Sequence, residues 1–292
     1  MFEFRTLDSE APARRYAAFM EAFSDYSVPV AWSEAEFDAV NARRGADWSL
    51  SLGAYEGGRL VGFVMSGSGE WGGRKAAYDM GTGVVPSARG SGLAGLLAER
   101  LKGLLAERGV GLYLLEVIRD NAPALKTYER AGFRKTRDFE CSEGTFVDPG
   151  KAPPEGVAVG ELAAFPRAEA AAMRDWEPSW QNSDASVARN PTPLVILGAR
   201  EASAPGAAGA AAGRLLGYAV ASPSGTIWQL AVAREARRRG IGTALLRGLA
   251  ARTGGALRYI NAQSDDAGTR TLLARSGIRE DVGQYEMTLE LE

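Results

Sequence analysis

Apolar residues follow two different periods along this chain, and both halves of the chain show them in the same order. Residues 76–85 and 226–232 are short, largely apolar runs of the kind that forms a buried strand. In the segment after each run, apolar residues recur every three or four positions, as one buried face of an amphipathic helix requires. This stripe consists of Leu93, Leu96, Leu97, Leu101, Leu104 and Leu105 in the first half and of Ile241, Leu245, Leu246 and Leu249 in the second.

The other predicted elements also occur twice. A further apolar strand is predicted at 112–118 and at 257–263, and each is followed by a short helix that ends at a glycine. Upstream, 48–67 and 194–222 each have the pattern of an antiparallel strand pair, the second with an Ala/Gly-rich insertion. The repeat has a period of about 145–148 residues, which is domain-sized. The sequence therefore predicts a duplicated α/β domain with helices packed on a sheet.

A segment rich in proline and glycine, residues 144–156, separates the two copies and is predicted to be a linker. We therefore expect an N-terminal domain over residues 1–143 and a C-terminal domain over residues 157–292. The composition agrees with this division, because 292 residues with 46% hydrophobic and 24% charged side chains suffice for two globular cores.

The balance of charge and the shortness of the apolar runs argue against nucleic acids and membranes as partners. The 34 Lys and Arg residues nearly balance the 36 Asp and Glu residues, and the resulting net charge of −2 gives no support to nucleic-acid binding. The N-terminus has no basic region followed by an apolar core, and no apolar run approaches the roughly 18 residues of a membrane span. We therefore expect a cytoplasmic protein that binds neither nucleic acid nor membranes.

The residues that the chain lacks narrow its chemistry further. It contains no histidine and one cysteine, so it can form no Ser-His-Asp or Cys-His nucleophile system, no Cys/His zinc site and no intrachain disulfide. No acidic spacing argues for magnesium, and no metal is expected. Any proton transfer must use Asp, Glu, Tyr, Lys or water.

A glycine-rich turn stands at the start of the first amphipathic helix. Residues 90–95 satisfy G-x-G-x-x-G, a pattern that is by itself a weak indication of a dinucleotide site. Such a site also needs an acidic residue at the tip of the next strand, and Glu116 lies inside that strand instead. The second copy, residues 237–242, lacks the third glycine. The two copies share R-x-x-G-x-[GA], and a dehydrogenase remains a third alternative.

This shared element resembles the acyl-CoA-binding motif of the GNAT acyltransferase superfamily, and the resemblance extends over most of both halves. It implies two tandem GNAT domains, each a mixed, mostly antiparallel central sheet flanked by helices, with acetyl-CoA as the acyl donor. Successive backbone N–H groups at the start of a helix form an anion site, and small residues let a pyrophosphate approach. The leading arginine adds charge, and the preceding strand would pair with the pantetheine arm.

The residues that the resemblance assigns to CoA follow from these two turns and strands. They are Val84, Val85, Arg89, Gly90, Ser91, Gly92, Leu93 and Ala94 in the first copy, and Ala231, Val232, Arg237, Arg238, Arg239, Gly240, Ile241 and Gly242 in the second.

A second motif follows the strand at 112–118. Residues 121–133 look like the superfamily's N-x-x-A-x-x-x-Y-x-x-x-G-F segment, which adds Asn121 to the implied CoA-binding residues. The tyrosine of this segment commonly stands near the CoA sulfur, so the resemblance implies that Tyr128 is a general acid. A tyrosine pKa of about 10 lies above the roughly 8.5 of a thiol, so Tyr128 stays protonated until the thiolate leaves. The alternative is that Tyr128 is an ordinary core side chain.

The attacking amine must lose a proton, because an ammonium with a pKa of about 10.4 is no nucleophile. Asp79, on the strand that enters the glycine turn, is the candidate base, and Glu116 is its rival. The usual Asp pKa of about 3.9 is low for this task, so a water relay or strong desolvation is needed. A solvated or salt-bridged, non-catalytic Asp79 is the alternative. Candidate acceptor-binding residues are Asp25, Tyr26, Tyr78, Thr82 and Glu116.

The second copy departs from this pattern at the catalytic positions. Leu273 stands at the position of Tyr128, and Ile227 at the position of Asp79. We therefore expect one catalytic domain, the N-terminal one, and a degenerate C-terminal domain that either binds CoA or only packs.

The expected function is transfer of an acetyl group from acetyl-CoA to a primary amine of a small molecule, by direct attack in a ternary complex. Protein lysine or N-terminal amines are alternative acceptors, and a non-catalytic acyl-CoA-binding module is an alternative function. The protein is expected to be either a monomer with an internal pseudo-dimer or a homodimer.

Overall fold

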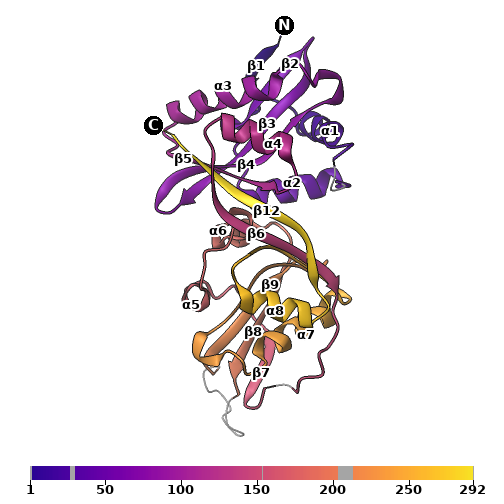
Figure 1. Cartoon of the computed structure of the whole chain (residues 1–292), viewed down its shortest axis with the longest axis vertical. Helices are drawn as coiled ribbons and strands as arrows, with labels where there is room; N and C mark the ends of the chain where they lie inside the picture. The colour runs from indigo at the N-terminus through magenta and orange to yellow at the C-terminus, as the bar shows by residue number, and fades with distance from the viewer. Residues whose placement is uncertain (1, 27–29, 153, 203–212, 292) are drawn as a thin grey trace. The chain divides into compact units, whose positions relative to one another are not determined.

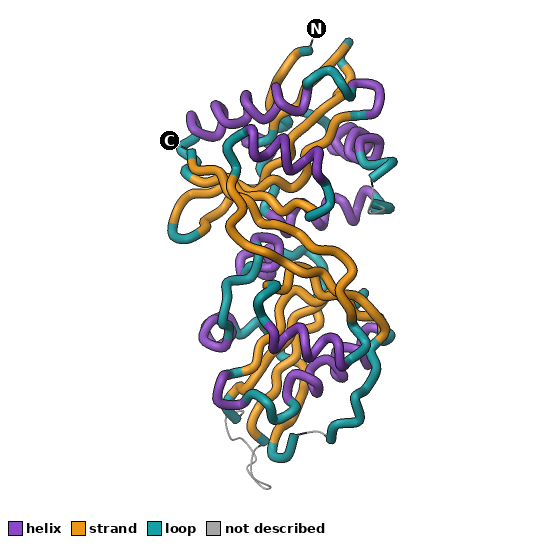
Figure 2. The backbone as a smooth tube through the Cα atoms, in the orientation of Figure 1, coloured by secondary structure: helices purple, strands orange, loops and turns teal. Residues whose placement is uncertain are grey.

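A computed structural model describes residues 2–26, 30–152, 154–202 and 213–291 of the chain (Figure 1). Helices and strands alternate along it in the duplicated order that the apolar pattern predicts (Figure 2). Most of the Ala/Gly-rich insertion, residues 203–212, lies outside the described residues. In the part of the chain that is described, no helix is long and apolar enough to cross a membrane.

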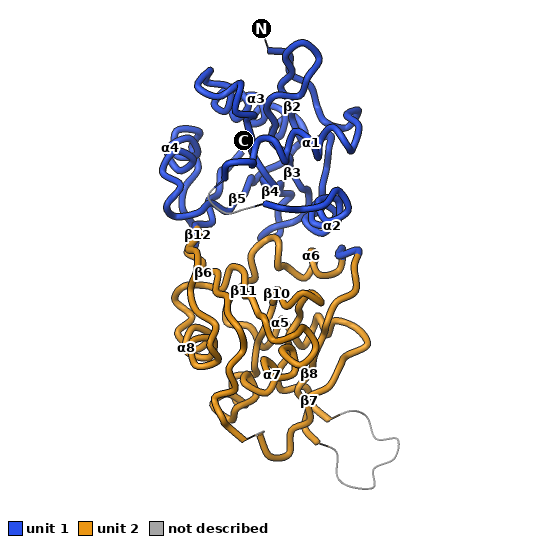
Figure 3. The backbone as a smooth tube through the Cα atoms, turned by 90° about the vertical axis from the view of Figure 1, so that its right-hand side faces the viewer, with its two compact units in different colours: residues 1–137, 189–191, 285–292 blue, residues 138–188, 192–284 orange. Residues whose placement is uncertain are grey.

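The chain divides into two compact units (Figure 3). Unit 1 comprises residues 1–137, 189–191 and 285–292, and unit 2 comprises residues 138–188 and 192–284. Each unit therefore includes residues from both sides of the segment 144–156.

Unit 1 is built on a mixed sheet in the order β1-β2-β3-β4-β5. Neighbours are antiparallel except for β4 and β5, which are parallel. The strands are β1 (Glu3–Thr6), β2 (Leu52–Glu56), β3 (Arg59–Trp71), β4 (Arg74–Val84) and β5 (Leu112–Ile118). The helices are α1 (Pro12–Ala22), α2 (Glu34–Arg44), α3 (Leu93–Glu107) and α4 (Ala122–Arg130).

Helices cover both faces of this sheet. A Cβ atom on Gly62 of β3 would meet Leu93 and Leu97, so α3 lies on that face. Its apolar stripe buries Leu93, Leu97, Leu101 and Leu105, whereas Leu96 is exposed, so the buried face is narrower than the predicted one. Gly83 of β4 is paired with Phe63 of β3, and a Cβ atom on Gly83 would meet Ala22 of α1. Because successive residues of a strand point to opposite faces, α1 lies on the face away from α3.

The parallel strands β4 and β5 pair over only three residues each, ending at Tyr78 and Leu114. A β-bulge follows at once, because the register of β4 against β3 shifts between Asp79 and Gly81. From Asp79 onward, the edge of β4 on the β5 side has no strand partner among the described residues. The carboxyl ends of these two parallel strands therefore leave an opening in the sheet, where ligands bind in folds of this kind.

Unit 2 repeats the arrangement. Its strands are β7 (Val157–Glu161), β8 (Val195–Glu201), β9 (Leu215–Ala221), β10 (Thr226–Val232) and β11 (Ala256–Gln263). Its helices are α5 (Arg167–Met173), α6 (Asp184–Arg189), α7 (Ile241–Thr253) and α8 (Ala267–Arg275). The parallel pair β10 and β11 again separates early, after Ile227, and β10 again bulges at the next residue.

Two long strands, β6 (Arg134–Thr145) and β12 (Arg279–Glu290), complete the sheets. In unit 2, residues 139–145 of β6 pair antiparallel with β11. The C-terminal part of β12 belongs to unit 1 and is held there by Glu286. The Glu286 side chain is 4% exposed, and its carboxylate accepts hydrogen bonds from Arg137 at 2.5 Å and from Thr136 at 3.0 Å. The C-terminal residues are therefore part of the core of unit 1.

The buried pair of Arg137 and Glu286 should matter more to stability than the exposed pair of Arg74 and Glu290 on the same strand. Glu286→Ala leaves a largely buried guanidinium without its carboxylate, which should cost about 2–4 kcal/mol of unfolding free energy. Glu290→Ala should cost less than about 1 kcal/mol. Urea unfolding of both variants checks this, and equal losses would contradict it.

Candidate active site

Each unit has a glycine turn that ends in an uncapped helix N-terminus. Gly92 is the N-cap of α3 with φ 76°, and Gly240 is the N-cap of α7 with φ 92°; neither helix has a side-chain cap. Two positions earlier, Gly90 and Arg238 are also left-handed, at φ 76° and 65°. Alternating left-handed residues turn successive N–H groups to one side, and the helix dipole adds positive potential there. Both turns are thus suited to an anion.

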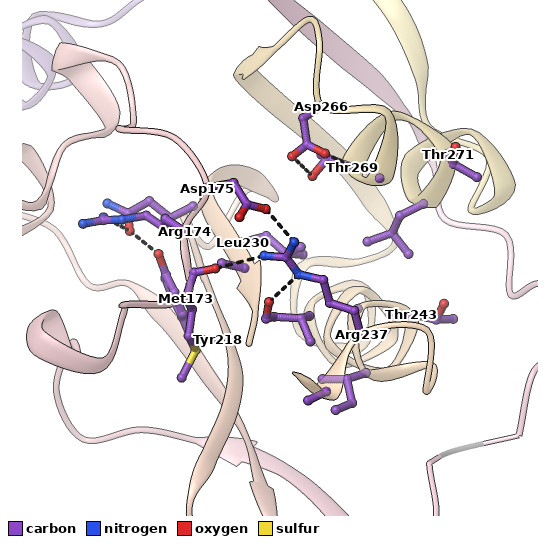
Figure 4. A pocket seen from close by; sticks show the side chains of 18 of the residues that line it. Met173, Arg174, Asp175, Tyr218, Leu230, Arg237, Thr243, Asp266, Thr269 and Thr271 are labelled. Carbon is purple, nitrogen blue, oxygen red and sulfur yellow. Dashed lines mark hydrogen bonds and ion pairs between the residues drawn. The ribbon is translucent and has the colours of Figure 1, made fainter. Parts of the chain in front are cut away.

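A cavity adjoins each turn. In unit 1 it has a volume of about 600 Å³ and lies between the turn, the end of β4 at Val84, and α4 at Thr127 and Arg130. In unit 2 it has a volume of about 590 Å³ and extends from Arg237 on the turn to Tyr218 on β9 (Figure 4). Tyr259 on β11 also lines it. A Cβ atom at Gly90 or Gly92 would meet nothing within 4 Å, so a ligand can approach that backbone closely.

Asp79 lies at the point where β4 leaves β5, and it is 8% exposed. Its carboxylate accepts from the Thr82 hydroxyl at 2.6 Å and from the Gly81 N–H at 2.9 Å. Burial raises the pKa of Asp79 to about 6, although both hydrogen bonds oppose that change. The desolvation that a catalytic base at this position needs is therefore present.

Tyr128 on α4 contacts the same carboxylate. Its hydroxyl donates to Asp79 Oδ2 at 3.4 Å, and its ring meets Phe133 edge-on with 5.5 Å between centroids. Burial, and next the charge of Asp79, raise the pKa of Tyr128 well above its usual value. The phenol thus remains protonated at neutral pH. The structure brings Tyr128 to Asp79 and Thr82 of β4, although Tyr128 lies 49 positions after Asp79 in sequence.

Tyr78 and Glu116 form a second polar contact beside this group. The Tyr78 hydroxyl donates to Glu116 Oε2 at 2.8 Å, so the rival base is engaged by a phenol. Arg44 at the end of α2 donates to the Met80 carbonyl at 3.1 Å. Burial, and next the charge of Arg44, lower the pKa of Arg43 to about 9. These two arginines are not predictable from the sequence, because nothing in the pattern of α2 shows that its last turn faces β4.

The structure places Asp25 against Arg89 of the glycine turn. Both oxygens of its carboxylate accept from the guanidinium, at 2.6 and 2.8 Å. Tyr26 packs edge-on against Phe23, at 5.2 Å between ring centroids. Its phenol lies close enough to Tyr128 to contribute to the raised pKa of that residue.

Unit 2 lacks the acid and base at the equivalent positions. Ile227, immediately before the bulge of β10, is fully buried, and Leu273 on α8 is 2% exposed. Asp266 accepts from Thr269 N at 3.0 Å as the N-cap of α8, just as Asn121 accepts from Ala124 N at 3.2 Å at the start of α4.

Other polar groups face the unit 2 cavity. Gln229 accepts from the Tyr218 hydroxyl at 2.8 Å and from Arg174 at 3.1 Å, and Arg174 pairs with Asp184 at 2.5 Å. Both side chains of that ion pair are nearly buried, at 10% and 12% exposure. This cluster is not predictable from the sequence, because its members come from four separate segments and match no motif.

No group of three or more Asp, Glu or Cys side chains that could hold a metal ion occurs in the described ranges.

Comparison with known proteins gives the same family twice. The model of the acetyltransferase (GNAT) family matches residues 16–133 and 162–277. A GCN5-related N-acetyltransferase from Sphaerobacter thermophilus is similar over 100% of this chain and 96% of that chain, with TM-score 0.71 and 20% identity. A tandem GNAT protein from the clavulanic acid biosynthesis pathway is similar over 100% and 99%, with TM-score 0.71 and 17% identity.

A putative acetyltransferase from Pyrococcus horikoshii is similar over 100% of this chain and 90% of that chain, with TM-score 0.69 and 15% identity. At such identities the likeness concerns the fold. Together with the two family matches, it confirms the predicted pair of tandem GNAT domains, each with a mixed sheet flanked by helices.

The raised pKa of Asp79 has a consequence for stability. Its folded-state pKa is about 6, above its unfolded value, so the folded protein holds the proton more tightly and loses stability as pH rises from about 4 to 6. Asp79→Asn removes the buried charge. It should therefore stabilise the protein above pH 6, by an amount on the order of 2–3 kcal/mol, and by little at pH 4.

Thermal unfolding across this pH range measures the effect. Asp8→Asn is the matched control, because a hydrogen bond from Thr6 holds the pKa of Asp8 below its usual value, and its variant should gain no stability at any pH. A wild-type protein more stable than Asp79→Asn at pH 8 would show that Asp79 is not buried as a costly charge.

Proposed function

The chain belongs to the acetyltransferase (GNAT) family and is an acyltransferase, and from this premise we propose that unit 1 moves an acetyl group from acetyl-CoA to a primary amine of a small molecule. The observation that carries the proposal is the contact of Tyr128 with Asp79 at the opening between β4 and β5. A phenol and a carboxylate with a pKa of about 6 are the acid and the base that aminolysis of a thioester requires.

Acetyl-CoA would bind along the opening. Its pyrophosphate would accept from the N–H groups of residues 90–94, which start an uncapped helix. The pantetheine arm would pair with the free edge of β4 near Val84 and Val85, as an added strand does. This direction leads the thioester from the cavity toward Asp79 and Tyr128. Asn121 supports the site by capping α4, the helix that carries Tyr128.

The chemistry follows from the two pKa values. Asp79 takes a proton from the ammonium of the acceptor, and the free amine attacks the thioester carbonyl in the ternary complex. The C–N bond forms, the attacking nitrogen releases its second proton to water, and the C–S bond breaks as the tetrahedral intermediate collapses. Tyr128 donates its proton to the leaving sulfur, which becomes the CoA thiol. The hydrogen bond between the two side chains lets Asp79 return a proton to the phenolate.

The acceptor would be a cationic amine. Glu116 on β5 and Tyr78, the residue before Asp79 on β4, would offer a carboxylate and an aromatic ring, which suit an ammonium group. Thr82 fixes the orientation of the Asp79 carboxylate. The lysine or N-terminal amine of a protein carries the same charge, and it is the alternative acceptor.

For unit 2 we propose binding of acyl-CoA without turnover. The turn at residues 237–242 has the same backbone conformation as that of unit 1, with Arg239 adding charge, and a cavity of about 590 Å³ adjoins it. Ala231 and Val232 on β10 would hold the pantetheine arm. Buried Ile227 and Leu273 offer neither a base nor an acid.

Matched variants of the two turns test this unequal assignment. Ser91 and Arg239 are exposed and occupy equivalent positions. A glutamate at either position repels a pyrophosphate. With acetyl-CoA and a panel of amines, following free thiol, Ser91→Glu should lower kcat/KM for acetyl-CoA at least about tenfold. Arg239→Glu should weaken CoA binding to unit 2 and leave turnover within about twofold of wild type.

Calorimetric titration with CoA provides the control, because each variant should remove one of two binding sites per chain. Loss of turnover in Arg239→Glu with retention in Ser91→Glu would assign catalysis to unit 2 and overturn the proposal.

A further inference from the structure

We propose that Arg89 and Asp25 form a latch that holds the glycine turn of unit 1 against the segment after α1. In this role Arg89 does not bind a phosphate of CoA. It positions the turn that binds the acyl donor relative to the segment that binds the acceptor amine. The latch is defined as these two side chains with the carbonyls of Ala22 and Val84. The inference rests on the proposed function, and it adds positioning residues to that site.

Arg89 is held by four hydrogen bonds to three partners. Its Nε donates to the Val84 carbonyl at 3.1 Å, and Nη2 donates to the Ala22 carbonyl at 3.0 Å. Nη1 and Nη2 donate to the two oxygens of Asp25 at 2.6 and 2.8 Å. A guanidinium has five N–H donors in a fixed plane, so these bonds determine its orientation. The two terminal nitrogens of the guanidinium face the end of α1.

Unit 2 has the same latch (Figure 4). Arg237 Nε donates to the Val232 carbonyl at 2.9 Å, and Nη2 donates to the Met173 carbonyl at 3.3 Å. Nη1 pairs with Asp175 at 2.6 Å. In both units the first acceptor is five residues before the arginine, and the second is the last residue of the first helix. The carboxylate follows that helix end by three residues in unit 1 and by two in unit 2.

The bonding pattern explains why each contact is favourable. Ala22 ends α1, and the last carbonyls of a helix lack partners within it, so a cation is favoured there. The carboxylate then neutralises the guanidinium. The pair itself is exposed, at 41% for Arg89 and 60% for Asp25, so it adds little to global stability. Its effect is therefore local and geometric.

The segment that the latch holds lies on the acceptor side. Asp25 is followed by Tyr26, whose phenol influences Tyr128, and Arg89 is followed directly by Gly90 of the anion turn. The latch thus connects the donor turn to the segment that carries Tyr26. In unit 2 the corresponding segment continues to Trp176, which donates to Asp266 Oδ2 at 3.0 Å, so it is anchored at both sides of the cavity.

A double-mutant cycle separates this role from that of a phosphate ligand. We would measure CoA affinity by calorimetry and kcat/KM for the acceptor by thiol release, in Asp25→Asn, Arg89→Gln and the double variant. The latch predicts that each single variant lowers kcat/KM for the acceptor about threefold to tenfold, while the CoA Kd changes less than about twofold. The double variant should be no worse than either single one, and Asp25→Glu should retain most of the activity.

A phosphate-binding Arg89 predicts a different pattern. Arg89→Gln would weaken CoA binding at least about tenfold, while Asp25→Asn, which frees the arginine, would leave the affinity unchanged or increase it. That result would overturn the latch. Glu21→Gln and Arg59→Gln, which remove another exposed ion pair of unit 1, at 2.5 Å, are matched controls that should leave turnover and CoA affinity unchanged.

Hydrogen exchange distinguishes failure of the latch from failure of the proposed function. If no amine is acetylated, the proposed function fails, and the latch is judged from the amides of residues 22–26. These should exchange faster in both Asp25→Asn and Arg89→Gln than in wild type, with no additional change in the double variant. Unchanged exchange in the single variants would overturn the latch whatever the turnover.

Discussion

The early separation of the parallel strands β4 and β5 is the constraint on which the rest of unit 1 depends. Their pairing ends at Tyr78, and a bulge follows, so Asp79 is buried at the apex of an opening and not at a solvated strand end. The same separation leaves one edge of β4 available to an extended ligand. Burial of the carboxylate and exposure of the strand edge are therefore two results of one backbone feature. In the proposed mechanism, both bring the thioester beside the base.

The burial of Asp79 has opposite effects on stability and on chemistry. A desolvated carboxylate costs folding free energy, and the same desolvation brings its pKa to about 6, where it can accept a proton near neutral pH. Unit 2 has the same strand separation and bulge but places Ile227 there, so it avoids that cost. The two units therefore share the architecture of the opening and differ in the chemistry at its apex. The proposed division into a transferring unit and a binding unit follows from this difference.

Sequence patterns predicted the features that depend on local order. The apolar periods predicted β2–β5 with α3 and α4, and their counterparts β8–β11 with α7 and α8, but not the other elements. The shared glycine turn predicted the equivalence of Arg89 with Arg237. Contacts between distant segments could not be found in this way. The ion pair of Asp25 with Arg89 joins residues 64 positions apart, and Glu286 completes the core of unit 1 from nearly the end of the chain. Neither contact leaves a periodic signal in the sequence. Asp25 lies in the loop after α1, and the apolar pattern of β12, which carries Glu286, does not show to which unit the strand belongs.

The central claim, that Asp79 and Tyr128 act as base and acid in unit 1, is tested most directly by the pH dependence of kcat/KM for the acceptor. Because Asp79 must be deprotonated, log kcat/KM should fall with falling pH through about 6. This limb should be absent in Asp79→Asn. Tyr128→Phe should keep the limb and lower the plateau about tenfold to a hundredfold. A wild-type limb that survives in Asp79→Asn, or an unchanged plateau in Tyr128→Phe, would contradict the account.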